Sequence, residues 1–153
     1  LVTLQFTKDH THQENTLFLN ELYHFIISNN NNIFYLKNHP RFNHEVNLQE
    51  LLNLTNVQLI NHNINSCFLK CSLHITVYST TTFEAALLGV PTIFLNESCN
   101  YNYFKKIFHY PINHALIDFE DDEIYKRSSE TVQSWAKDYY TFFDSSKFIS
   151  LLK

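Results

Sequence analysis

Glycine is almost missing from this sequence: Gly89 is the one glycine among 153 residues. Many proteins bind phosphates with glycine-rich loops, because the absence of side chains lets the backbone approach the phosphate closely. Neither G-x-G-x-x-G nor G-x-x-x-x-G-K-[ST] occurs here. A phosphate-binding site in this protein would therefore have to use side-chain hydroxyls, a histidine or a helix N-terminus.

Methionine is absent and cysteine is rare, with three cysteines in the chain. Because a translated chain begins with methionine, we expect this sequence to be one domain of a longer protein. An odd number of irregularly spaced cysteines predicts reduced thiols in a cytosolic protein. Cys67 and Cys71 are predicted to be small core residues, since two thiols make a poor zinc site.

Charged residues and long hydrophobic runs are also scarce. Charged residues make up 17% of the chain and the formal net charge is −4, so the sequence offers no basic surface for nucleic acid or an anionic membrane. No apolar run approaches the roughly 20 residues that span a bilayer. The nine histidines form neither H-E-x-x-H nor a tight cluster with cysteine, and G-x-S-x-G is missing. We therefore expect no metal site and no nucleic-acid partner.

What the sequence does contain is an alternation of short strand-like and helix-like segments. Strands are predicted at Leu1–Phe6, Ile33–Lys37, Val57–Ile60, Leu73–Tyr78, Thr92–Leu95 and Ala115–Asp118. Helices are predicted at Glu14–Ser28, Leu48–Leu54, Asn65–Cys71, Thr82–Leu88, Tyr101–Phe108, Asp121–Phe143 and Ser146–Leu152. The alternation predicts a single α/β domain over residues 1–153. Its sheet should be Rossmann-like, doubly wound and mostly parallel, with about six strands and helices on both faces.

The segment Tyr78–Asn96 is the most informative one. It contains a strand end, four hydroxyl residues at Ser79–Thr82, a short helix and a buried strand. Gly89, followed by Val90 and a proline, predicts a left-handed residue that ends the helix. Thr81-x-x-Glu84 matches a capping box, an alternative that accounts for one hydroxyl but not for four in succession.

Two polar loops follow predicted strands, at Lys37–Pro40 and at Ser79–Thr82. In a sheet of this kind ligands bind beyond the carboxyl ends of the strands. Pro40 restrains His39 to an extended conformation, and an imidazole can donate a hydrogen bond to phosphate. A lone loop histidine is more often a surface residue, and Lys37 either adds charge to the site or ends its strand in solvent.

These two loops together carry a resemblance to a known family. K-x-H-P at Lys37–Pro40, followed about forty residues later by Y-S-T-T-T-F-E-A-A-L-L-G-V-P-T-I at Tyr78–Ile93, resembles the C-terminal donor-binding domain of GT-B fold glycosyltransferases. The likeness is greatest to bacterial sialyltransferases, polysialyltransferases and capsule-synthesis enzymes.

The resemblance implies roles for individual residues. His39 would contact the nucleotide phosphate, aided by Lys37, and Glu84 would reach the ribose of the donor. Further ligand contacts are implied for residues after the third and fourth strands: Ser79, Thr80 and Thr81 on phosphate oxygens, and Asn61 and His62 near the base.

The resemblance also implies an activity and partners. The full-length protein would be a cytoplasmic enzyme, at the inner face of the membrane, that transfers a sugar from a nucleotide-sugar to a glycan acceptor. CMP-sialic acid is one such donor. The resemblance implies no cofactor and no metal, and it implies a catalytic base in an N-terminal domain, so the isolated domain should turn over poorly. Two alternatives remain open: a UDP-N-acetylglucosamine 2-epimerase-like domain and a non-enzymatic α/β interaction module.

Overall fold

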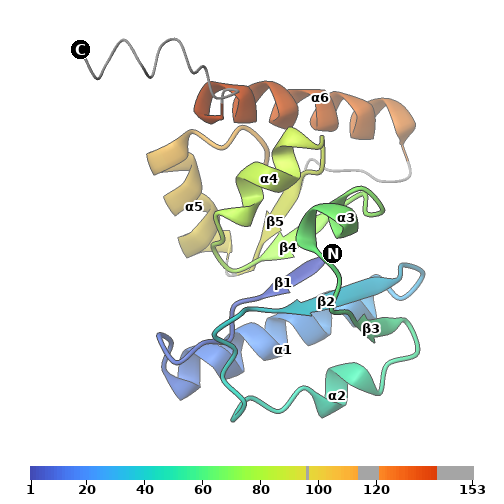
Figure 1. The fold of residues 1–153 in the computed structure, drawn as a ribbon, viewed down its shortest axis with the longest axis vertical. Coiled ribbons are helices and arrows are strands. Elements are labelled where there is room, and N and C mark those ends of the chain that lie inside the picture. The colour runs from blue at the N-terminus through green and yellow to red at the C-terminus, as the bar shows by residue number, and fades with distance from the viewer. Residues whose placement is uncertain (96, 114–120, 141–153) are drawn as a thin grey trace.

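The protein is an α/β domain built on a five-stranded parallel sheet (Figure 1). The computed structural model describes residues 1–95, 97–113 and 121–140, with the backbone alone at 97–101. The sheet has the order β3-β2-β1-β4-β5. Its strands are β1 (Val2–Leu4), β2 (Phe34–Asn38), β3 (Val57–Leu59), β4 (His74–Thr76) and β5 (Thr92–Phe94). The predicted fold class is confirmed with five strands instead of about six, and the sixth predicted strand, Ala115–Asp118, lies outside the described residues.

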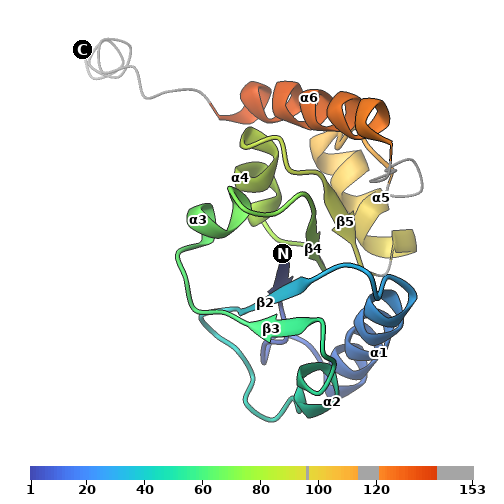
Figure 2. The same ribbon diagram turned by 90° about the vertical axis from the view of Figure 1, so that its right-hand side faces the viewer.

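Helices connect the strands and cover both faces of the sheet. They are α1 (His12–Ser28), α2 (Gln49–Leu52), α3 (Ile64–Phe68), α4 (Thr81–Leu87), α5 (Glu97–Phe108) and α6 (Asp122–Tyr139). Figure 2 shows α1 and α5 on one side of the strands and α3 and α4 on the other. Helix α6 packs against α4. The predicted helix Ser146–Leu152 lies outside the described residues, as do the last residues of the predicted helix Asp121–Phe143.

The strand order places a topological switch point beside β1. Val2 pairs with Leu36 of β2 on one side and with Ile75 of β4 on the other. The chain passes from β1 outward to β2 and β3, and then returns to place β4 on the opposite side of β1. In open parallel sheets, the crevice at such a point, beyond the carboxyl ends of the strands, is where ligands bind.

The short strands can form a stable sheet because most of their residues lie in the core. All residues of β1, β4 and β5 are buried, as expected for a parallel sheet covered on both faces.

Aromatic side chains connect the helices α4, α5 and α6. Phe83 of α4 stacks on Trp135 of α6, with ring centroids 4.8 Å apart. The indole N–H of Trp135 donates a 2.6 Å hydrogen bond to the carbonyl of Phe108, so α6 is fixed to both α4 and the end of α5.

The thiols fit the expected positions in part. Cys67 is buried and Cys71 is half-buried, and both are free thiols. The side chain of Cys99 lies outside the described residues. Among the helices that the structure describes, none is long and apolar enough to cross a membrane.

Candidate functional site

His39 lies at the carboxyl edge of the sheet, beside the end of β1. Its backbone N–H donates to the carbonyl of Leu4 at 3.1 Å. Its ring Nδ1 accepts a hydrogen bond from the backbone N–H of Arg41 at 3.0 Å. Burial and the Arg41 cation lower the pKa of the His39 ring, against an opposing effect of Asp9. The ring is therefore neutral at pH 7, with its hydrogen on Nε2, from which it can donate to a ligand.

The four hydroxyl residues after β4 do not share one environment. Ser79 is buried, and its Oγ accepts the backbone N–H of Thr81 at 3.3 Å. The hydroxyl of Thr81 lies 3.4 Å from Nε2 of His74, a fully buried histidine of β4. Thr82 is fully buried as well. Thr80 is exposed and makes no capping hydrogen bond through its side chain. Within this turn, Thr80 is the residue exposed to solvent.

The first backbone N–H groups of α4 are already paired. The N–H of Thr82 donates to the carbonyl of Ser79 at 3.1 Å, and that of Phe83 to the carbonyl of Thr80 at 3.0 Å. The Thr81–Glu84 capping box is not formed, so that interpretation is wrong. A ligand on this turn would depend on the Thr80 hydroxyl more than on free N–H groups.

Glu84 is half-buried on α4. One of its carboxylate oxygens is buried and has no hydrogen-bond partner among the described residues. Burial raises the pKa of this carboxyl group. Because this oxygen is buried, a ligand hydroxyl, whose binding the resemblance implies, would have to use the other carboxylate oxygen.

The side chain of Lys37 is directed away from the hydroxyl turn, Ser79–Thr82. Its Nζ donates a 2.6 Å hydrogen bond to the carbonyl of His62, and both Asn61 and His62 are exposed after β3. Because β2 separates β3 from β1, Asn61 and His62 lie on the far side of β2 from the switch point. The structure thus brings Lys37 together with the two predicted base contacts.

Sequence reasoning missed three residues at the switch point itself. Oε1 of Gln5 accepts the backbone N–H of Tyr78 at 2.6 Å, and Nε2 of Gln5 donates to the Tyr78 carbonyl at 3.1 Å. The Gln5 amide therefore continues the pairing of β1 and β4 where the strands end. The hydroxyl of Tyr78 lies 2.6 Å from Nε2 of His10. No local pattern could have indicated this cluster, since its members are up to 73 residues apart.

An exposed ion pair borders the same edge. Arg41 and Asp9 approach to 2.7 Å, with side chains 70% and 55% exposed. A pair so open to water contributes about 1 kcal/mol of stability at most. Its consequence is local: it keeps two opposite charges near His39, where Arg41 lowers and Asp9 raises the pKa of the ring.

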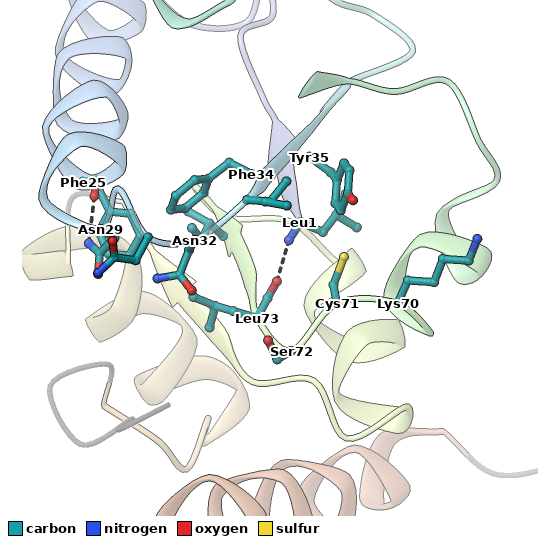
Figure 3. Close-up of a pocket in the computed structure, with 13 residues that line it drawn as sticks. Leu1, Phe25, Asn29, Asn32, Phe34, Tyr35, Lys70, Cys71, Ser72 and Leu73 are labelled. Carbon is teal, nitrogen blue, oxygen red and sulfur yellow. Dashed lines mark hydrogen bonds between the residues drawn. The ribbon is translucent and has the colours of Figure 1, made fainter. Parts of the chain in front are cut away.

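A hollow of about 350 Å³ opens at the opposite edge of the sheet (Figure 3). It is lined by Leu1, Tyr35 and Leu73, at or beside the starts of β1, β2 and β4, together with Asn32 and Cys71. The backbone nitrogen of Leu1 donates to the carbonyl of Leu73 there. This hollow is separate from His39 and the hydroxyl turn.

No group of three or more metal-ligating side chains occurs in the described part of the chain.

Comparisons with known proteins identify no relative. No protein-family model matches the chain. No curated protein matches it. No solved structure matches it either. A functional assignment therefore depends on the sheet topology and on the residues at its carboxyl edge.

Proposed function

We propose that this chain is the donor-binding domain of a nucleotide-sugar-dependent glycosyltransferase in bacterial surface polysaccharide synthesis. One observation carries the proposal. The Nε2–H of His39 and the hydroxyl of Thr80 follow β2 and β4, the strands on either side of β1, at the same edge of the sheet. That edge contains the switch point at which nucleotides bind in folds of this order.

The chemistry of the two groups suits the leaving group of glycosyl transfer. As the glycosidic bond breaks, negative charge develops on the nucleotide phosphate. Donors held in place before the reaction stabilise such charge without having to reorganise. Hydrogen bonds to Leu4 and Arg41 position His39. Backbone hydrogen bonds in the turn that begins α4 position Thr80.

Other residues take subsidiary roles in this proposal. Glu84 accepts a hydrogen bond from the ribose, and Asn61 and His62 approach the base with Lys37 beside them. A CMP-activated acid sugar is the proposed donor. The glycan acceptor and the catalytic base belong to a second domain. The whole enzyme works in the cytoplasm at the membrane surface.

Calorimetric titration with CMP, CDP, UDP and GDP tests the proposal. We expect one of these nucleotides to bind and to raise the thermal midpoint of unfolding, because it binds the native state alone. His39→Ala and Thr80→Val should each weaken binding about tenfold or more, since a hydrogen bond to a charged group contributes about 1.5–3 kcal/mol. His24→Ala and Thr55→Val, at exposed positions on α1 and before β3, are the matched controls.

The alternatives give different results. A non-enzymatic module would bind none of the four nucleotides, which would overturn the proposal. Unchanged affinity in both His39→Ala and Thr80→Val would remove the site from this edge. Product analysis with the full-length protein separates a glycosyltransferase from a UDP-N-acetylglucosamine 2-epimerase.

A further inference from the structure

Tyr78 has a fixed backbone and an open ring at the switch point. Both polar groups of its backbone are bonded to the side chain of Gln5, at 2.6 and 3.1 Å. Its side chain is 42% exposed. With both backbone groups bonded, the hydroxyl is the polar group of Tyr78 whose orientation decides what the residue can bind.

His10 sets that orientation. Its ring packs edge-on against Phe18 and Tyr78, with centroids 5.4 and 5.5 Å apart. Its Nε2 lies 2.6 Å from the Tyr78 hydroxyl oxygen, while its Nδ1 is buried and has no partner within the described ranges. A buried N–H without an acceptor is rarer than a buried acceptor without a donor. We therefore assign a ring hydrogen to Nε2, which donates it to the Tyr78 hydroxyl oxygen.

The hydrogen of the Tyr78 hydroxyl is then directed away from His10. The described residues provide no second partner for this hydroxyl. The nearby carboxylates are engaged elsewhere, Asp9 by Arg41 and Glu14 by Thr11. Burial and those two carboxylates raise the pKa of Tyr78, so it stays protonated near neutral pH. Tyr78 thus offers a hydrogen-bond donor to solvent beside the carboxyl ends of β1 and β4.

We infer that the Tyr78 hydroxyl donates a hydrogen bond to a phosphate oxygen of the bound nucleotide, between His39 and Thr80. The inference rests on the proposed function. His39 follows β2 and Thr80 follows β4, so a ligand that reaches both has to pass over the end of β1, where Gln5 holds the backbone of Tyr78. His10 is the positioning residue that supplies the hydrogen bond to Tyr78.

Tyr78→Phe tests this role without disturbing the ring or the backbone bonds to Gln5. Its affinity for the nucleotide that the wild-type protein binds, and for inorganic pyrophosphate, should fall about five- to tenfold. Tyr103→Phe is the matched control, because Tyr103 is an exposed tyrosine on α5. Wild-type affinity in Tyr78→Phe would overturn the inference and leave the proposed function standing. Absence of binding by the wild-type protein would overturn both.

A double-mutant cycle tests the part played by His10. His10→Phe keeps a ring against Phe18 but removes the donor to Tyr78, and should weaken binding about two- to threefold. In the Tyr78→Phe background the same change should have no effect on affinity, since no hydroxyl remains to be oriented. Equal effects in both backgrounds would mean that His10 acts on packing alone, and would overturn its positioning role.

Discussion

Replacing Gly89 with alanine tests how the chain leaves α4 for β5. Gly89 has φ +74°, a conformation that L side chains rarely adopt. Its N–H donates to the carbonyl of Ala86 and the N–H of Val90 to that of Ala85, both at 2.9 Å, the two bonds of a Schellman motif. A Cβ at this position would lie 2.5 Å from Oγ of Ser129 on α6. The glycine therefore satisfies a backbone requirement and a packing requirement together.

The two requirements differ in size. The left-handed conformation costs an alanine about 1–2 kcal/mol, of which its stiffer unfolded chain returns about 0.4–1 kcal/mol. Only the hydroxyl of Ser129 would clash with the new Cβ, because the Cβ and carbonyl oxygen of Ser129 would lie 3.8 and 3.9 Å from it. Rotation of that hydroxyl relieves the contact at a cost of about 1 kcal/mol or less. We expect Gly89→Ala to lower the free energy of unfolding by about 1–2 kcal/mol, with the backbone as the larger cause.

Urea unfolding followed by the fluorescence of Trp135, the single tryptophan, measures this loss. Trp135 is nearly buried on α6, against α4, so it reports on the same interface. Ser129→Ala alone should be close to the wild-type protein. It should recover less than half of the loss when combined with Gly89→Ala. A Gly89→Ala protein as stable as the wild type, or full recovery in the double variant, would refute the backbone argument.

Three further changes should alter stability measurably. Burial holds the pKa of His74 well below its ordinary value of 6.5. Because the unfolded ring gains a proton below that pH and the folded ring does not, stability should fall as pH drops below 6.5, by up to about 1.4 kcal/mol per pH unit. Unfolding curves measured between pH 5 and 8 should show a weaker slope in His74→Gln, and parallel slopes would contradict this. Thr11→Ala removes the side chain that forms a capping box with Glu14, so thermal unfolding should show a loss of about 1 kcal/mol; Glu14→Gln, which retains a side-chain acceptor, should lose less. Gln5→Met removes both bonds to the Tyr78 backbone, so amide hydrogen exchange at Tyr78 should accelerate, and an unchanged rate would show that the Gln5 bonds do not protect it.

The positions of the described strands could be predicted from the sequence, but the end residues of the elements were predicted less accurately. The ends of each described strand lie within two residues of the predicted ends, because buried parallel strands are compact apolar runs bounded by polar turns. The left-handed stop at Gly89 was also predicted correctly, since a glycine followed by proline after a helical pattern has few other uses. Helix α5 begins four residues earlier than predicted, at Glu97, although an asparagine before an acidic residue is a recognised helix start signal.

The capping box shows where local pattern fails. Thr-x-x-Glu occurs at Thr11–Glu14 and at Thr81–Glu84, and the sequence gives no reason to prefer one. The first forms the box, with Glu14 accepting the N–H of Thr11 at 2.8 Å. At the second, Ser79 already satisfies the N–H of Thr81. Which pattern forms a cap is decided by neighbours that become close only after folding.

The run of hydroxyls after β4 illustrates the same limit at the proposed site. His74 is fully buried, and a buried imidazole needs partners for both nitrogens. It finds Thr3 at 2.8 Å and Thr92 at 3.0 Å on the neighbouring strands, with Thr81 at 3.4 Å. Thr81, a member of the hydroxyl run, is therefore a third partner of a histidine that the sequence did not single out. This moves the argument for ligand binding onto Thr80, the exposed member of the run, and onto Tyr78, which directly precedes the run.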